Sequence, residues 1–215
     1  MKNTATFVPF EAPPFQVESM PITTIKLAVS QAEREAVYRF RYGIYVEEMQ
    51  RKQIYADHIE KRIEDPLDRN GYTIAAWKDG LVVATVRNNH LNDAATDHYC
   101  NFYQACGNTQ NHKIAITTRL MVAPSHRCSM LATRVCIALY KEALSRGVER
   151  AYLDCNAHLV KYFQGLGYRI HRDRVEHEEY GAVTVMHLNL LDLNYLQRIR
   201  SPFRRACKEF LDLHR

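Results

Sequence analysis

The sequence predicts one α/β domain with three layers, in which a mixed β-sheet lies between helices on both faces. Three observations support this. The chain has 215 residues, a length typical of one domain and enough to bury about 70% of the unfolded surface. Hydrophobic residues make up 47% and charged residues 25%, as in ordinary globular proteins. Segments with strand-like and helix-like patterns are mixed along the whole chain, which favours one mixed sheet.

Local signals mark where the expected elements begin and end. Ser30 and Glu33 form a capping box that starts the first helix. Asp79-Gly80 is a two-residue turn that joins two strands into a hairpin, and Pro124 ends the apolar strand before it. In order, we expect a strand at 22–29, a helix at 30–49, a polar loop at 50–70, strands at 72–78 and 81–88, a short helix at 97–106 closed by Gly107, a strand at 114–122, a helix at 131–145, a strand at 151–155, a helix at 158–164, and strands at 168–172 and 182–190.

Both ends of the chain differ in composition from its middle. Residues 1–21 contain four of the seven prolines and are expected to form an extended arm. Residues 22–195 carry the domain. Residues 196–215 are expected to form a basic amphipathic helix, or a pair of short helices broken near Pro202.

The formal net charge is 29 − 24 = +5, which indicates an anionic partner. From Gln197 to Arg215 there are six Lys or Arg residues against two acids, so this end alone carries +4. Two interpretations stay open. The basic helix is either a solvated face or a surface that receives an acidic carrier protein or an anionic membrane, and nucleic acid is not the favoured partner.

Several classes of chemistry lack support in the sequence. There is no glycine-rich phosphate loop, no G-x-S-x-G elbow and no H-E-x-x-H motif, so neither a metal site nor a nucleophilic triad is predicted. The six cysteines form no C-x-x-C pair, and the N-terminus lacks the apolar core of a signal peptide. Free thiols and a cytoplasmic location are therefore expected.

Two segments carry the informative motifs. The strand that holds Thr118 and Arg119 is followed by a polar turn with Arg127 and then by a helix, whose N-terminus can attract an anion. The second segment runs from Asn156 to Tyr168 and is a helix between two strands. A plain strand–helix connection and a helix packed on the sheet are the simpler interpretations of the two segments.

Together the two segments resemble the GNAT acyltransferase superfamily. Arg127-x-x-Met130-x-Ala132 stands where that family has [QR]-x-x-G-x-[GA], and Asn156 stands eleven residues before Gly167, as in its N-x-x-A-x-x-x-Y-E-K-x-G-F pattern. The segment F-R-Y-G-I-Y-V-E-E-M at 40–49 resembles a helix of the long-chain N-acyl amino acid synthases, which are relatives of the acyl-homoserine-lactone autoinducer synthases. Other matching positions are Asp65, Asp68, Arg87, Thr118-Arg119, Glu179-Tyr180-Gly181 and Arg200-Ser201-Pro202-Phe203.

The resemblance implies a GNAT-like fold and an N-acyltransferase. Such an enzyme moves a medium or long fatty acyl chain from acyl carrier protein to the amine of an amino acid, by direct attack on the thioester. No permanently bound cofactor is implied, and the acyl phosphopantetheine thioester is a co-substrate. The implied catalytic residues are Glu47, Asp65, Asp68, Thr118 and Arg119; the substrate-binding residues are Arg41, Tyr45, Arg87, Asn156 and Tyr162; and the acyl-donor-binding residues are Met121, Val122, Arg127, Ser129, Met130, Leu131 and Ala132.

Departures from the family pattern bear on the mechanism. Met130 replaces a glycine and should crowd the pyrophosphate of coenzyme A, which favours acyl carrier protein as the donor's carrier. Ile116 stands where the autoinducer-type strand has a Glu, and Phe163 stands where a general-acid Tyr is common. The general base therefore stays open among Glu47, Glu48, Asp65, Asp68 and a water held by the backbone.

Three sets of alternatives remain at this point. Asp65 and Asp68 either hold the acceptor's amine or belong to a solvated acidic loop. Arg41, Arg87 and Arg119 either bind an acceptor carboxylate or form structural pairs with Glu47, Asp65 or Asp68. The rival functions are a coenzyme A-dependent N-acetyltransferase of a small amine or protein, and a catalytically silent GNAT-fold binding module.

Overall fold

A seven-stranded mixed sheet forms the centre of the computed structural model, which describes residues 23–91, 94–105, 113–177 and 179–214. Its strand order is β1-β4-β5-β6-β7-β9-β8, and β6 and β7 are parallel neighbours while the other neighbouring pairs are antiparallel. The strands are β1 (Thr24–Leu27), β4 (Tyr72–Lys78), β5 (Leu81–His90), β6 (Ile114–Val122), β7 (Arg150–Cys155), β8 (Arg169–His177) and β9 (Gly181–Asn189). A separate pair of short strands is formed by β2 (Ala56–Asp57) and β3 (Arg62–Ile63).

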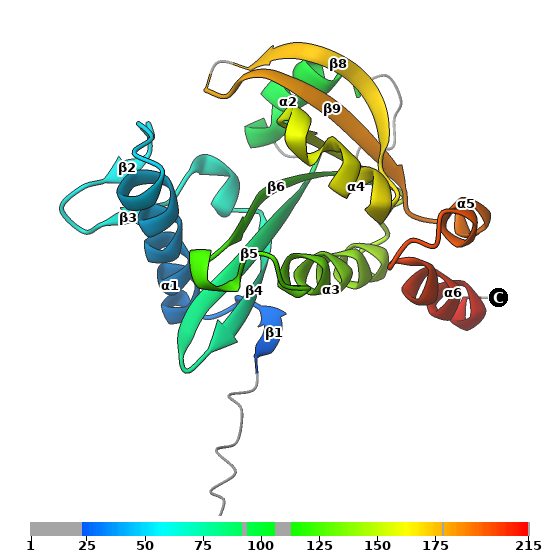
Figure 1. Cartoon of the computed structure of the whole chain (residues 1–215), viewed down its shortest axis with the longest axis horizontal. Helices are drawn as coiled ribbons and strands as arrows, with labels where there is room; N and C mark the ends of the chain where they lie inside the picture. The colour runs from blue at the N-terminus through cyan, green and yellow to red at the C-terminus, as the bar shows by residue number, and fades with distance from the viewer. Residues whose placement is uncertain (1–22, 92–93, 106–112, 178, 215) are drawn as a thin grey trace, which may run out of the picture.

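Helices cover both faces of this sheet, so the three-layer prediction is confirmed (Figure 1). On one face, Val37 of α1 packs with Ala75, and Tyr103 of α2 packs with Ile116. On the other face, Val135 of α3 is buried on the inner strands, and α4 continues that layer. The helices are α1 (Gln31–Tyr42), α2 (Asp97–Tyr103), α3 (Leu131–Ser145), α4 (Val160–Leu166), α5 (Leu193–Arg198) and α6 (Arg204–Leu213).

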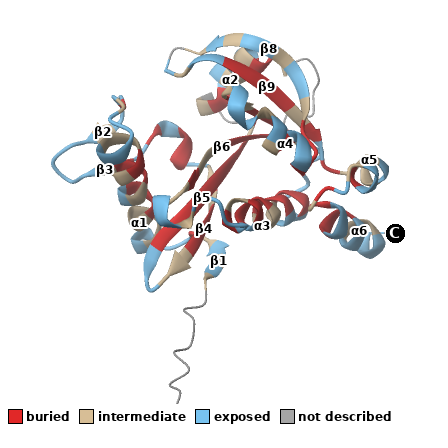
Figure 2. Ribbon diagram, in the orientation of Figure 1, coloured by how far each residue is buried: buried red, intermediate tan, exposed pale blue. Residues whose placement is uncertain are grey.

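The buried residues concentrate on the central strands and on the inner faces of the helices (Figure 2). The predicted bounds of β6 and α3 coincide with the observed ones. The capping box of Ser30 and Glu33 is present at the start of α1. The predicted helix at 30–49 ends as an α-helix at Tyr42 and continues as a π-helical turn, Gly43–Glu48. Such wide turns are often found near functional sites.

Most other predicted bounds differ from the structure by one or two residues, and two differences have a clear physical reason. The short helix α2 ends at Tyr103, because Gln104 takes the left-handed conformation at φ 51°; the expected stop at Gly107 lies outside the described residues. Strand β8 continues to His177 rather than to residue 172. It is the last strand of the sheet and pairs with β9 alone, and its charged residues are tolerated because an edge strand meets solvent.

The basic C-terminal segment folds as α5 and α6, with Pro202 between them. Cys207 of α6 is buried, and Glu209 pairs with Lys141 near the C-terminal end of α3, with 3.6 Å between Oε2 and Nζ. Lys141 lies ten residues after Leu131, the first residue of α3, which corresponds to about 15 Å along a helix axis. The basic tail therefore packs at the far end of α3 from the turn that carries Arg127.

Other expectations fall partly outside the described residues. The proline-rich arm at 1–21 lies outside them. Cys128, Cys136, Cys155 and Cys207 are free thiols, but Cys100 is disulfide-bonded, so the prediction of free thiols is wrong at that residue. None of the helices in the described part of the chain is long and apolar enough to cross a membrane.

Candidate active site

The candidate site lies where the parallel strands β6 and β7 separate. The two strands pair over Ile114–Ile116 and Arg150–Tyr152. Beyond these residues β6 runs on to Val122 and β7 to Cys155, and the register between them gives no further pairs. The facing edge of β6 from Thr117 onward consequently has no strand partner. Backbone N–H groups on such an edge can donate hydrogen bonds to a ligand.

A β-bulge bends β6 at the same place. Thr85 of β5 pairs with Met121, while Arg87 pairs with Thr118, so two residues of β6 face one residue of β5. Arg119 lies in the bulge and takes the left-handed backbone conformation, at φ 57°. Its carbonyl accepts a hydrogen bond from the Thr85 hydroxyl at 3.2 Å. A bulge increases the local twist, which helps to turn β6 away from β7.

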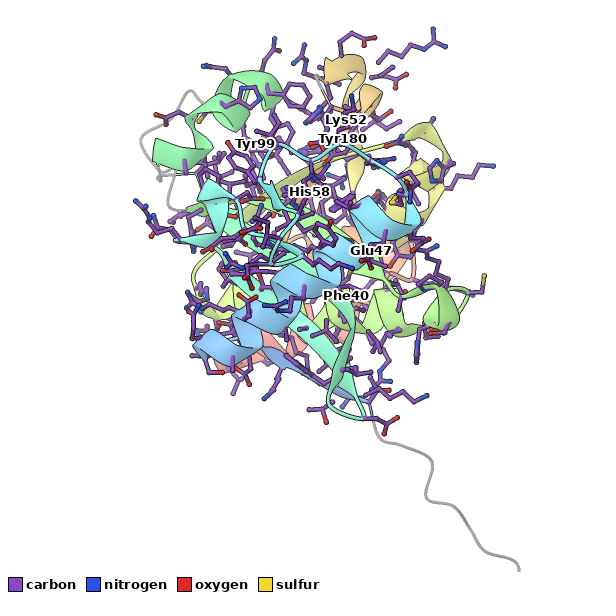
Figure 3. The ribbon with its side chains drawn as sticks, turned by 90° about the vertical axis from the view of Figure 1, so that its left-hand side faces the viewer. Phe40, Glu47, Lys52, His58, Tyr99 and Tyr180 are labelled. Carbon is purple, nitrogen blue, oxygen red and sulfur yellow. The ribbon has the colours of Figure 1, made fainter. Side chains whose placement is uncertain are left out.

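A cavity of about 400 Å³ fills this fork. Seven of the residues predicted from the sequence line it: Tyr45, Thr118, Arg119, Met121, Val122, Arg127 and Asn156. One part of the cavity wall comes from the end of β6, Arg127 and Asn156. The other part comes from the π-helical turn, α2 and the turn between β8 and β9, through Tyr45, Tyr99 and Tyr180, and the two parts meet where Arg127 binds Glu48 of the π-helical turn. Figure 3 shows Tyr99 and Tyr180 on the side of the molecule that also carries the π-helical turn with Glu47.

Arg41, Arg87, Asp65 and Asp68 do not line the cavity but lie in a buried ion network behind it. Arg87 Nη1 donates to Asp65 Oδ1 at 2.7 Å and to Asp68 Oδ1 at 2.6 Å. Arg41 Nη1 donates to Asp68 Oδ2 at 2.6 Å. Arg119 Nη2 donates to Asp65 Oδ2 at 2.8 Å, so this arginine connects the network to the cavity wall.

The local sequence explains why the two aspartates point inward. Asp65 caps the short helix Pro66–Asp68 by accepting a hydrogen bond from the amide of Leu67 at 3.0 Å. Asp68 Oδ2 in turn accepts a hydrogen bond from the backbone amide of Asp65 at 2.9 Å, which completes the capping box. Position 71, just after this turn, requires a glycine, because a Cβ atom there would lie 2.6 Å from the Leu67 carbonyl oxygen and 3.0 Å from Arg87 Cδ. The interpretation of this segment as a solvated acidic loop is therefore wrong, since both carboxylates are buried.

The ion network fixes the protonation of these groups. Burial alone would raise the pKa of Asp65, but the charges of Arg87 and Arg119 hold that pKa well below its usual range. Burial opposes ionisation of Asp68 in the same way, and Arg87 and Arg41 lower its pKa. A carboxylate with a lowered pKa is a weak base. The geometry therefore suits Asp65 and Asp68 to positioning Arg87 and Arg119.

The remaining predicted residues lie around the cavity or away from it. Glu47 pairs with Lys61 on the surface, with 3.0 Å between Oε1 and Nζ. Glu48 binds Arg127 through both carboxylate oxygens, at 2.6 and 2.9 Å. The Tyr162 hydroxyl lies 4.0 Å from Cys136 Sγ and does not line the cavity. Glu48 therefore reaches the cavity only through its ion pair with Arg127, which lines the cavity.

The start of α3 carries the other predicted donor-binding residues. Ser129 Oγ donates to the His126 carbonyl at 2.6 Å and accepts from the amide of Leu131 at 3.2 Å, which fastens the turn to the helix. Met130 occupies the N-cap and is 66% exposed. Leu131 and Ala132 form the first turn of α3. Cys128, in the same turn, takes a left-handed conformation at φ 62°.

Several residues of the cavity were not predicted as site residues. Asp154 of β7 lines the cavity and accepts a hydrogen bond from the buried Tyr103 hydroxyl at 2.6 Å. Arg51 and Glu179 also line it. Glu179 accepts from Gln53 Nε2, while Gln53 Oε1 accepts from Arg119 Nη1 at 3.2 Å. A charged residue inside the otherwise apolar strand 151–155 is the signal that could have identified Asp154.

A fork between two parallel strands, a bulge in one of them and a helix that begins beside the fork belong to a GNAT-like fold, and the family match makes the chain an acyltransferase. The chain belongs to the family of the N-acyl amino acid synthase FeeM, which matches residues 36–189. No curated protein sequence matches the chain. Within the described residues, no group of three or more His, Cys, Asp or Glu side chains is placed to hold a metal ion.

Solved structures share the fold at low sequence identity. The coenzyme A-dependent acyl-homoserine lactone synthase MesI is 22% identical, with a TM-score of 0.64 over 86% of this chain and 95% of MesI. FeeM, an N-acyl amino acid synthase from uncultured soil microbes, is 13% identical, with a TM-score of 0.63 over 86% of this chain and 98% of FeeM. A putative N-acetyltransferase from Lactobacillus plantarum is 20% identical, with a TM-score of 0.57 over 78% and 98% of the two chains.

Proposed function

We propose that the protein transfers a medium- or long-chain fatty acyl group from the phosphopantetheine thioester of acyl carrier protein to the amine of an amino acid. The cavity at the β6–β7 fork carries this proposal. It combines an unpaired strand edge, which can receive a thioester carbonyl, with a polar half that has room for an amino acid. Membership of the FeeM family supports the reaction class.

The walls next to α4 suit an acyl chain. Leu120, Leu159 and Phe163 line this part of the cavity. Phe163 also borders a second, apolar void of about 20 Å³, which lies between α3, α4 and the sheet and is lined by Tyr140. A void of this size holds about one water molecule, so an acyl chain could extend into it only if Phe163 moves. Phe163 is therefore proposed to set the length of chain that the site accepts.

The proposed chemistry is direct attack of the amine on the thioester. The nitrogen forms a bond to the carbonyl carbon, the carbon–sulfur bond breaks, and the sulfur leaves as a thiol with the proton that the nitrogen loses. A backbone amide near Met121 or Val122 would stabilise the oxyanion. An acceptor that arrives as an ammonium must first lose one proton, and Asp154 is the proposed group that takes it. Asp154 lies where the two strands separate, and one of its oxygens is held by Tyr103.

Asp154 compensates for the absence of a carboxylate on β6. Ile116, which stands at the family's Glu, pairs with Tyr152 of β7. Alternate residues of a strand face the same side of the sheet, so Tyr152 and Asp154 lie on the face that α2 covers. The proposed general base of this protein therefore lies on β7, whereas the Glu of the autoinducer-type synthases corresponds to a position on the neighbouring strand β6. Thr118 and Arg119 are proposed to position the acceptor, and Asn156 to contact the donor.

Coenzyme A is the second candidate for the donor's carrier, because MesI is a coenzyme A-dependent synthase. Met130 distinguishes the two candidates, since its exposed side chain occupies the N-cap of α3, where a pyrophosphate would approach. We expect acyl carrier protein to be the preferred carrier, and Met130→Gly to raise kcat/KM for acyl-coenzyme A alone. Ser129→Ala at the same turn is the matched control.

The carrier is proposed to dock at the end of α3 that carries Arg127. The basic helices α5 and α6 pack at the opposite end of α3, and none of their residues lines the cavity. An acidic carrier protein bound there would approach the site from the wrong end. Charge reversal of Arg134, on the first turns of α3, should raise KM for acyl carrier thioesters more than charge reversal of Lys208 on α6.

The proposed function is tested with purified protein, acyl carrier and coenzyme A thioesters of several chain lengths, and a panel of amino acids. Mass spectrometry should detect N-acyl amino acids, and the yield should fall in Asp154→Asn. An absence of N-acyl products across the whole panel would refute the proposal. Products formed from acetyl-coenzyme A alone would instead favour the N-acetyltransferase.

A further inference from the structure

The proposed acceptor brings a carboxylate into a partly enclosed cavity, where an unpaired anion is costly. A cation with free donors is therefore needed in the acceptor half. Three arginines line the cavity: Arg51, Arg119 and Arg127. The sequence leaves two roles open for Arg119, which either binds the acceptor carboxylate or forms a structural ion pair. The contacts of each guanidinium decide which of the three is available.

Two of these arginines are already committed to other groups. Arg119 donates to Asp65 through Nε and Nη2, at 3.2 and 2.8 Å, and to Gln53 through Nη1 at 3.2 Å. Arg127 donates both terminal nitrogens to Glu48, and its Nε to the Val122 carbonyl at 3.1 Å. Each of these guanidinium groups therefore already uses three of its five N–H donors on protein acceptors.

Arg51 differs from both. Within the described part of the chain its side chain makes neither an ion pair nor a hydrogen bond, and its guanidinium carbon lies 5.3 Å from the ring centroid of Tyr180. Stacking on an aromatic face fixes the plane of a guanidinium and leaves the N–H donors at its edge free. Tyr180 also lines the cavity, so Arg51 is held at the cavity wall with its donors available.

The location of Arg51 places it on the acceptor side. Its amide donates to the Tyr45 carbonyl at 2.9 Å, which fixes the backbone just after the π-helical turn. Figure 3 shows the next residue, Lys52, on the same side of the molecule as Tyr99 and Tyr180. Arg127 and the start of α3 belong to the other half, where the phosphate of the donor would approach.

We propose that Arg51 binds the α-carboxylate of the acceptor, so that the protein selects α-amino acids over amines, amides and esters that lack this charge. The inference rests on the proposed function and names a specificity-determining residue for it. The guanidinium edge donates two hydrogen bonds to the carboxylate, while the amine points toward the fork and Asp154. Neighbouring Lys52 is exposed and absent from the cavity wall, which makes it the matched control.

The test measures binding of reaction products, so it does not depend on turnover. Isothermal titration compares N-dodecanoyl derivatives of glycine, leucine and phenylalanine with the corresponding carboxamides. We expect wild-type protein and Lys52→Gln to bind the acids at least tenfold more tightly than the carboxamides, and Arg51→Gln to lose this preference, as removal of charge-assisted hydrogen bonds predicts. Arg51→Lys should restore part of it. Carboxamide affinity that is unchanged in Arg51→Gln verifies that the variant is folded.

The possible outcomes separate the inference from the proposed function. Arg51→Gln that still prefers the acids by the wild-type ratio would overturn the inference alone. Equal binding of acids and carboxamides by the wild-type protein would overturn it as well. If the wild-type protein bound neither kind of product, the proposed function and the inference would both be overturned.

Discussion

Replacing Asp65 with Asn should destabilise the fold strongly, because this residue balances two buried arginines. Asp65 accepts hydrogen bonds from Arg87 at 2.7 and 3.2 Å and from Arg119 at 2.8 and 3.2 Å. An Asn keeps one acceptor oxygen and loses the negative charge. Each hydrogen bond to a charged group contributes about 1.5–3 kcal/mol, and loss of one partner of a buried ion pair costs about 3–5 kcal/mol. We therefore expect the free energy of unfolding to fall by about 3–5 kcal/mol.

Urea unfolding followed by fluorescence of Trp77, the one tryptophan of the chain, measures this loss. The exposed Glu209, which pairs with Arg205, provides the control, since Glu209→Gln should change stability little. The pH dependence is a second check. Because the folded-state pKa of Asp65 is lowered, its stabilisation is complete above the unfolded-state pKa of about 3.9 and is lost as the pH falls below it. A loss under about 1 kcal/mol, or an unchanged slope of stability in acid, would contradict the pairing described above.

Three further predictions concern the cavity and the thiols. Phe163→Ala should join the cavity to the void behind it and shift the preferred acyl donor toward longer chains, and a chain-length profile identical to wild type would contradict this role. Asp154→Asn should lower kcat/KM by about 10²–10⁴, the usual contribution of a general base; wild-type kcat/KM would exclude Asp154 as the base. Alkylation at neutral pH should modify exposed Cys128 first, because burial raises the pKa of Cys136 and of Cys155 to about 12; equal rates measured by peptide mass spectrometry would disagree with this burial.

The sequence allowed the layers of the fold to be predicted because its local signals agree with its tertiary contacts. The apolar run at 114–122 and the pattern at 131–145 have one possible structure each, and both matched β6 and α3. Strand β8 was predicted too short, because charges that end a buried strand are tolerated at an edge. The family pattern named Met121, Val122, Arg127 and Asn156, and all four line the cavity; their role toward the donor stays a prediction.

The place of Arg51 at the cavity and the burial of Asp65 and Asp68 could not be predicted from local patterns. Arg51 lies in a segment that has the composition of an ordinary polar loop, and only the tertiary path of that segment brings it to Tyr180. Asp65 and Asp68 have the composition of a surface turn, yet the capping box and three arginines draw both carboxylates inside. Whether these charges are solvated or buried depends on partners 19 or more residues away, and sequence spacing does not reveal those partners.

The left-handed backbone of Arg119 limits how this position can vary. At φ 57° the backbone accepts glycine or asparagine most easily and opposes β-branched residues. The side chain must be an arginine, because it supplies three hydrogen bonds to Asp65 and Gln53 that the point charge of a lysine cannot reproduce. A glycine would suit the left-handed backbone but would remove the hydrogen bonds to the Asp65 carboxylate. A lysine would keep the positive charge but could not form the same set of hydrogen bonds. Among the twenty amino acids, no second choice meets both demands, so a substitution at this position should cost either the backbone conformation or the bonds to Asp65 and Gln53.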